Sequence, residues 1–143
     1  MGRRPSDLTT AAKSPIPTLM PTLPPPLEKL YNTPVLRSEM PAGFDRAKVV
    51  RLAPDQRIHT LGAIRIDFSN ARASESVSYA LFKDVAHASV IARTERAVNT
   101  SGLFRVRVAV VGRLVVGVAA STGAQAKTLL DLALAHLRRS EKS

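Results

Sequence analysis

Asp84 and His87 are the two side chains whose spacing comes closest to a chemical site in this sequence. They stand three residues apart in a segment that is predicted to be helical, so both would lie on one face of that helix. A carboxylate beside an imidazole could bind a metal ion or share a proton. The same spacing is more often a helix N-cap followed by a first-turn residue, and we favour this structural interpretation.

The other catalytic and cofactor patterns are incomplete. The remaining histidines, His59 and His136, belong to no His-x-His or HExxH arrangement that would bring two nitrogens onto one metal. The stretch from Gly112 to Gly117 has the glycine spacing of a phosphate-binding loop but lacks the lysine and hydroxyl residue that follow in such loops. The absence of Cys excludes zinc ribbons, iron–sulfur clusters and thiol nucleophiles. We therefore predict no catalytic residue, no metal site and no cofactor.

The first half of the chain beyond residue 60 has the pattern of a hairpin followed by a helix. Residues 61–68 alternate between apolar and polar types, which predicts a half-exposed strand. Residues 77–82 could return as a second strand, although their spacing also fits one long helix beginning at Ser76. A helix covers Asp84 to Val98 in either case, because Asp84 is a good N-cap and residues 99–102 supply a stop.

The second half repeats this order. Residues 103–110 and 115–120 are predicted strands joined by a turn at Gly112, and Thr122 begins a capping box for the last helix. The order β-β-α-β-β-α predicts an α+β fold, with a four-stranded antiparallel sheet and both helices on one face. An edge strand around residues 48–52 would make the sheet five-stranded.

Proline dominates the start of the chain. Most of the ten prolines lie within residues 1–34, and their density from Pro15 to Pro26 favours polyproline II or disorder over helix or sheet. We therefore predict a flexible Pro-rich tail over 1–34 and a single α+β domain over 35–143. The leucines of the tail are more numerous than a solvated linker requires, so we expect part of it to lie on the domain or on a neighbouring subunit.

The net charge of +10 favours an anionic partner such as a nucleic acid or an anionic lipid surface. On the predicted strands, one outer sheet surface would carry Arg65, Arg105 and Arg107, and Arg113 would lie at the nearby turn. These four arginines are the predicted contacts for an anion or a nucleic acid. Only 4% of the residues are aromatic, which disfavours a platform on which bases stack.

The second hairpin also predicts a partly apolar outer face. This face consists of four side chains, Val111, Leu114, Val116 and Val118. An exposed apolar patch is typical of an interface, so we expect homodimerisation or the capture of an apolar partner segment here. The alternative is that the tail or residues 48–52 cover the patch within one chain.

These patterns favour a small non-catalytic binding or assembly module that holds a protein or anionic partner. The first alternative is a nucleic-acid-binding protein that uses the basic sheet face, which would make binding steeply salt-dependent. The second is a small enzyme with a pocket between sheet and helices near Tyr79, Asp84 and His87. No apolar run reaches the roughly 20 residues of a membrane span, and no apolar signal region follows Arg3 and Arg4. We therefore expect a cytoplasmic location.

Overall fold

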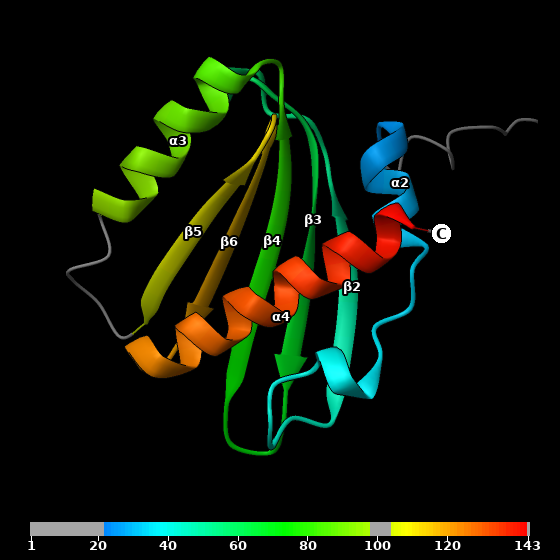
Figure 1. Ribbon diagram of the computed structural model, residues 1–143, viewed down its shortest axis with the longest axis vertical. Helices are drawn as coiled ribbons and strands as arrows, with labels where there is room; N and C mark the ends of the chain where they lie inside the picture. The colour runs from blue at the N-terminus through cyan, green and yellow to red at the C-terminus, as the bar shows by residue number, and fades with distance from the viewer. Residues whose placement is uncertain (1–21, 98–103, 143) are drawn as a thin grey trace, which may run out of the picture.

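The structure is a computed structural model that describes residues 22–97 and 104–142 of the chain (Figure 1). Within these residues one antiparallel sheet has the spatial order β2-β3-β4-β6-β5. The strands are β2 Arg46–Leu52, β3 Thr60–Ser69, β4 Ser74–Phe82, β5 Arg105–Val111 and β6 Leu114–Ala120. The helices are α2 Pro25–Tyr31, α3 Val85–Ala97 and α4 Gly123–Glu141, with short 3-10 turns η2 Arg37–Glu39 and η3 Gln56–Ile58. None of the described helices has both the length and the hydropathy that crossing a membrane requires.

The predicted α+β class and antiparallel sheet are confirmed. Residues 77–82 belong to strand β4, which pairs with β3 rather than starting a helix. The turn between β5 and β6 contains Gly112 at φ 61°, a left-handed conformation that glycine adopts without steric cost. Thr122 caps α4, and its side chain accepts a hydrogen bond from the Gln125 backbone N–H at 3.1 Å. β2 is the additional edge strand, so the sheet has five strands.

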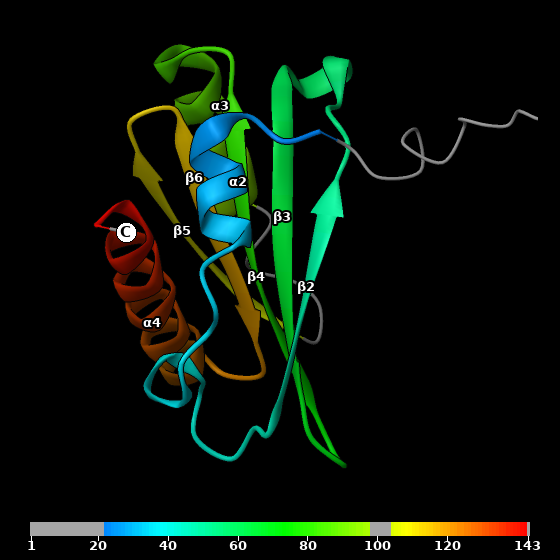
Figure 2. The same ribbon diagram turned by 90° about the vertical axis from the view of Figure 1, so that its right-hand side faces the viewer.

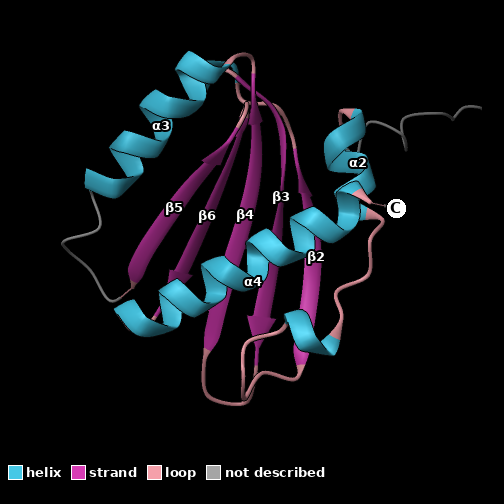
Figure 3. Cartoon of the chain, viewed as in Figure 1, coloured by secondary structure: helices cyan, strands magenta, loops and turns pink. Residues whose placement is uncertain are grey.

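α4 lies across one face of the sheet (Figures 2 and 3). Its buried side chains belong to the main core on that face. Side chains along β3 alternate in burial, and Ile64 and Ile66 point into this core. Leu129 and Ala133 of α4 are buried against the same cluster. The buried face of the alternating strand therefore packs against the apolar stripe of the helix, as the sequence predicts.

α3 packs on the opposite face, against β5 and β6. Val108 and Val115 belong to a second apolar cluster with Ala88 and Ala92 of α3, whereas Val116 belongs to the core under α4. Because successive side chains of a strand point to opposite faces, α3 and α4 lie on different sides of the sheet. The prediction that both helices cover one face is therefore wrong. The second hairpin is apolar on both faces, and each face needs its own cover.

The last part of the predicted flexible tail is a folded element. α2 begins at Pro25 and Pro26, where the missing N–H groups cost no intrahelical hydrogen bond. Leu27 and Leu30 of this helix are 0% and 1% exposed and join the main core. The prediction of disorder is wrong for this stretch, and the folded unit begins before residue 35. Residues 1–21 of the predicted tail lie outside the described residues.

α2 is attached to the sheet at two places. Gly62 of β3 has φ 148°, and a Cβ there would lie 3.3 Å from Pro24 Cδ and 3.5 Å from Leu27 Cδ1. Glycine at this position therefore lets the helix lie close to the strand. Arg51 of β2 donates hydrogen bonds to both carboxylate oxygens of Glu28, at 3.1 and 3.0 Å. This two-point ion pair fixes the orientation of the helix.

Candidate ligand-binding site

The structure separates the four arginines that were predicted to line one surface. Arg65 lies on the face that α3 partly covers, where its Nε donates to Asp67 Oδ1 at 2.9 Å. Arg105 and Arg107 pair across β6 with Ala120 and Val118, whose side chains belong to the core under α4, so they lie on the other face. Arg113 lies in the turn at the far end of β5. The prediction of a single basic sheet face is thus wrong. It placed the side chains of Arg105 and Arg107 on the wrong face of β5.

The apolar face of the second hairpin is largely internal. Leu114, Val116 and Val118 are buried in the core beneath α4, and Val111 alone of the four predicted residues is exposed, at 42%. The expectation of an open valine face is therefore wrong. The prediction exchanged the inner and outer faces of the hairpin, because valines occupy both faces. Only the end of this face at Val111 reaches the surface.

Asp84 and His87 form the local structure that the sequence favoured. Asp84 Oδ1 accepts a hydrogen bond from the His87 backbone N–H at 2.8 Å and lies 2.7 Å from His87 Nδ1. These two hydrogen bonds lower the pKa of Asp84. Tyr79 points into the opposite face of the sheet, so the residues named for an enzymatic pocket do not meet. Among the described residues, no group of three His, Cys, Asp or Glu side chains could hold a metal ion.

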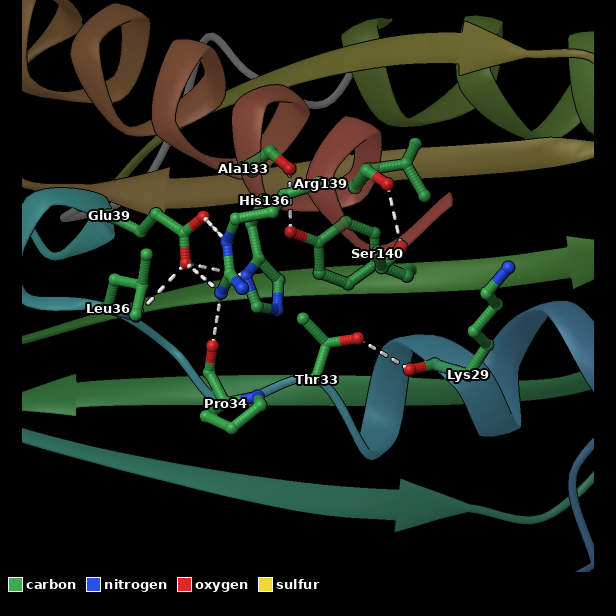
Figure 4. Close-up of polar contacts among 11 residues, drawn as sticks. Lys29, Thr33, Pro34, Leu36, Glu39, Ala133, His136, Arg139 and Ser140 are labelled. Carbon is green, nitrogen blue, oxygen red and sulfur yellow. Dashed lines mark hydrogen bonds and ion pairs between the residues drawn. The ribbon is translucent and has the colours of Figure 1, made fainter. Parts of the chain in front are cut away.

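A buried polar cluster joins α4 to the segment before β2, and Figure 4 shows its contacts. Glu39 is 7% exposed, and its Oε1 lies 2.8 Å from His136 Nδ1. Arg139 donates from Nε to Glu39 Oε2 at 2.6 Å and from Nη2 to Oε1 at 2.8 Å. The Leu36 backbone N–H donates to Oε1 at 3.0 Å, and Arg139 also contacts the Pro34 carbonyl. We call Glu39, His136 and Arg139 the Glu39 cluster.

The Glu39 cluster is a structural clamp. Burial alone would raise the pKa of Glu39, but hydrogen bonds from Arg139, the Leu36 backbone and His136 outweigh it and hold the pKa at about 2. The neighbouring Tyr79 hydroxyl donates to the Ala133 carbonyl at 2.8 Å, and burial raises the pKa of this phenol. The adjoining cavity of about 10 Å³ holds at most a single water molecule. A substrate has no room there, so the cluster fastens α4 to the chain that leads into β2.

Glu75 is the opposite case, a buried carboxyl with one oxygen that has no hydrogen-bond partner among the described residues. It is 4% exposed, its Oε1 forms no hydrogen bond with the described residues, and burial raises its pKa. A raised pKa means that folding favours the protonated acid, so this group stabilises the fold at acidic pH and loses that contribution as pH rises. We expect Glu75→Gln to stabilise the protein at neutral pH by on the order of 1 kcal/mol.

Urea denaturation of wild type and Glu75→Gln at pH 4 and pH 7 measures this effect. The gain should be larger at pH 7, where the wild-type carboxyl has to ionise in a buried position. The control is Glu141→Gln, because that side chain is exposed at the end of α4. A gain of equal size at both pH values would show that the charge of Glu75 is not the cause.

An apolar pocket opens where α2 and the end of α4 meet the sheet. Its volume is about 490 Å³, within the range of sites that bind small molecules. The floor consists of Leu81, Leu114 and Leu137, from β4, β6 and α4. The walls include Pro25 and Pro26 of α2, together with Val111 at the end of β5. We call this cavity the α2–α4 pocket.

Charged groups stand at the mouth of the α2–α4 pocket. Lys29 of α2 and Arg113 of the β5–β6 turn line it, together with Glu141 of α4. Lys29 Nζ donates to the Glu141 carbonyl at 3.3 Å, and Arg113 Nη1 donates to the Lys83 carbonyl at 3.4 Å. Within the described part of the chain, the hydrogen bonds of both cations are long contacts to neutral carbonyl oxygens, and each cation keeps donors for a ligand.

Three of the residues singled out in the sequence meet in this pocket, namely Arg113, Val111 and Leu114. From the sequence, Arg113 was predicted to contact an anion, and Val111 and Leu114 were predicted to form an interface. The three residues were not predicted to share one site. Lys29, Leu137 and Glu141 were missed, because their approach depends on the contact between α2 and α4. A comparison of the chain with protein-family models, curated proteins and solved structures finds no match.

Proposed function

We propose that the chain is a non-catalytic binding protein that holds a small amphiphilic anion in the α2–α4 pocket. The apolar body of the ligand would lie on Leu81, Leu114 and Leu137. Its acidic group would lie at the mouth, beside Arg113 and Lys29. The observation that supports this proposal is the combination of a leucine floor with two cations at one opening. A carboxylate or sulfonate on an apolar chain fits this arrangement, because guanidinium groups bind such anions through paired hydrogen bonds.

The size of the pocket favours a ligand over a large protein partner. A cavity of about 490 Å³ accommodates a molecule of drug or fatty-acid size. Glu141 contributes a negative charge to the same opening, so a ligand with several negative charges is disfavoured. A binding function was also predicted from the sequence, but there the binding site was expected on the sheet face, whereas the α2–α4 pocket lies at the end of the sheet.

Titration of the full-length, ¹⁵N-labelled protein with decanoate, followed by NMR, tests the proposal. We expect the amide signals of Val111, Arg113, Leu114 and Leu137 to shift. We expect Arg113→Ala to weaken decanoate binding by about tenfold, because one charge-assisted contact is lost. The control is Arg138→Ala, an exposed arginine of α4 that does not line the pocket. The Arg138→Ala variant should bind decanoate with the same affinity as wild type.

Decanol serves as an uncharged probe of the same length. If decanol and decanoate bind equally well, Arg113 does not recognise the anion and that part of the proposal is wrong. Val111→Trp tests the location, because the indole would fill the pocket from a half-exposed position. Unchanged decanoate affinity in a folded Val111→Trp variant would place the binding elsewhere and contradict the proposal.

A further inference from the structure

A second concave site lies at the outer edge of β5, away from the α2–α4 pocket. Its volume is about 330 Å³. Three of its lining residues are arginines, Arg96 of α3 and Arg105 and Arg107 of β5. The others are Val106, Val108, Gly123 and Leu130. We call the three side chains the edge arginines.

The fold brings the edge arginines together from both faces of the sheet. β5 is the last strand of the sheet, so its outer edge is open. Arg105 and Arg107 are two residues apart in this strand and lie on the same face. Arg96 comes from α3 on the other face and donates from Nη2 to the Val108 carbonyl at 3.1 Å. This hydrogen bond holds the Arg96 guanidinium at β5, where it lines the same cavity as Arg105 and Arg107.

The charge at this edge is not neutralised by the surrounding protein. Among the described residues, the side chains of Arg105 and Arg107 form no hydrogen bond or ion pair, and no carboxylate lines the site. Val106, Val108 and Leu130 supply apolar walls, which strengthen electrostatic contacts. Gly123 is the first residue of α4, and the first turn of that helix has no acidic side chain, so the positive end of its dipole adds to the field. Three like charges in one depression repel one another, and a bound anion would relieve that repulsion.

We propose that the edge arginines form a binding site for a small ligand with a multiply charged phosphate group, such as a diphosphate. Three guanidinium groups present enough donors to bind several phosphate oxygens at once. A singly charged carboxylate would leave most of this charge unmatched. A nucleic acid is less favoured, because Arg65 is paired with Asp67 on the other face and Arg113 lies at the far end of the strand. The four arginines predicted to contact a nucleic acid therefore do not form one continuous track.

Isothermal titration of the full chain with pyrophosphate tests this site. We expect the double variant R105A/R107A to weaken pyrophosphate binding by at least about tenfold, since two charge-assisted contacts are lost. The control is R46A/R72A, which removes two exposed arginines near the opposite edge strand and changes the net charge equally. In ¹⁵N NMR, pyrophosphate should shift the amide signals of Arg107 and Gly123 in wild type.

Equal weakening in R105A/R107A and R46A/R72A would show that pyrophosphate responds to net charge alone, which would overturn the proposal. The absence of pyrophosphate binding to wild type would also overturn it. A single-stranded oligonucleotide is the second probe. Oligonucleotide binding that weakens equally in both variants, without specific pyrophosphate binding, would identify a diffuse nucleic-acid surface instead. All four substituted arginines are exposed, so thermal denaturation should show that both variants remain folded.

Discussion

Replacing Glu39 with alanine is expected to lower the free energy of unfolding by about 3 kcal/mol at neutral pH. The substitution removes the carboxylate that His136, Arg139 and the Leu36 backbone N–H contact, and it leaves His136 buried without this partner. The lowered pKa of Glu39 supports a loss in the free energy of unfolding of the same size. A carboxyl whose pKa falls from 4.5 to about 2 on folding is linked to about 3 kcal/mol of stability. Because the group is buried, solvent screens this interaction little.

The pH dependence of stability provides the sharper measurement. The pKa of Glu39 is lower in the folded than in the unfolded chain, so its contribution is complete above pH 4.5 and is lost as pH falls towards 2. Chemical denaturation of wild type and Glu39→Ala between pH 7 and pH 3 should therefore show the two stabilities converging. Glu141→Ala, which removes an exposed carboxyl from the same helix as His136 and Arg139, should stay close to wild type at each pH. Parallel curves for Glu39→Ala and wild type would contradict the role of the clamp.

The sequence predicted those features that depend on local pattern. Alternation located β3 and β5, Gly112 located the turn, and Thr122 located the start of α4. Each of these signals lies within a few residues and reflects one strong local preference. The edge strand β2 was also anticipated around residues 48–52, although this stretch lacks the alternation of β3 and β5.

The orientation of the second hairpin could not be read from the sequence. β6 carries Val115 on one face and Val116 on the other, and both side chains are buried. Its sequence pattern therefore does not indicate which face of the strand points towards solvent. This ambiguity placed Arg105 and Arg107 beside Arg65. A strand buried on both faces requires helices on both faces, and that requirement was the missed signal.

Contacts between distant residues account for the remaining differences. Glu39 meets His136 and Arg139 across about a hundred residues of chain, and neither side of this cluster has a local signature. In α2, proline density suggested disorder, whereas Pro25 is an ordinary first helical residue when leucines follow at helical spacing. The mouth of the α2–α4 pocket depends on the same helix. Arg113 could be named from the sequence, but Lys29 could not.

Replacing Leu27 with alanine is expected to destabilise the fold by about 3 kcal/mol, the typical cost of a buried leucine truncation. Leu27 is 0% exposed and lies against Gly62, so the truncation leaves a cavity that the close backbone contact cannot fill. Urea denaturation measures this loss, and Leu36→Ala is the matched control because that leucine is 44% exposed. We expect the control to lose less than about 1 kcal/mol. Equal losses in the two variants would show that α2 is not part of the cooperative core. A large loss at Leu27 alone would show that the folded unit includes α2, the helix that forms one wall of the α2–α4 pocket.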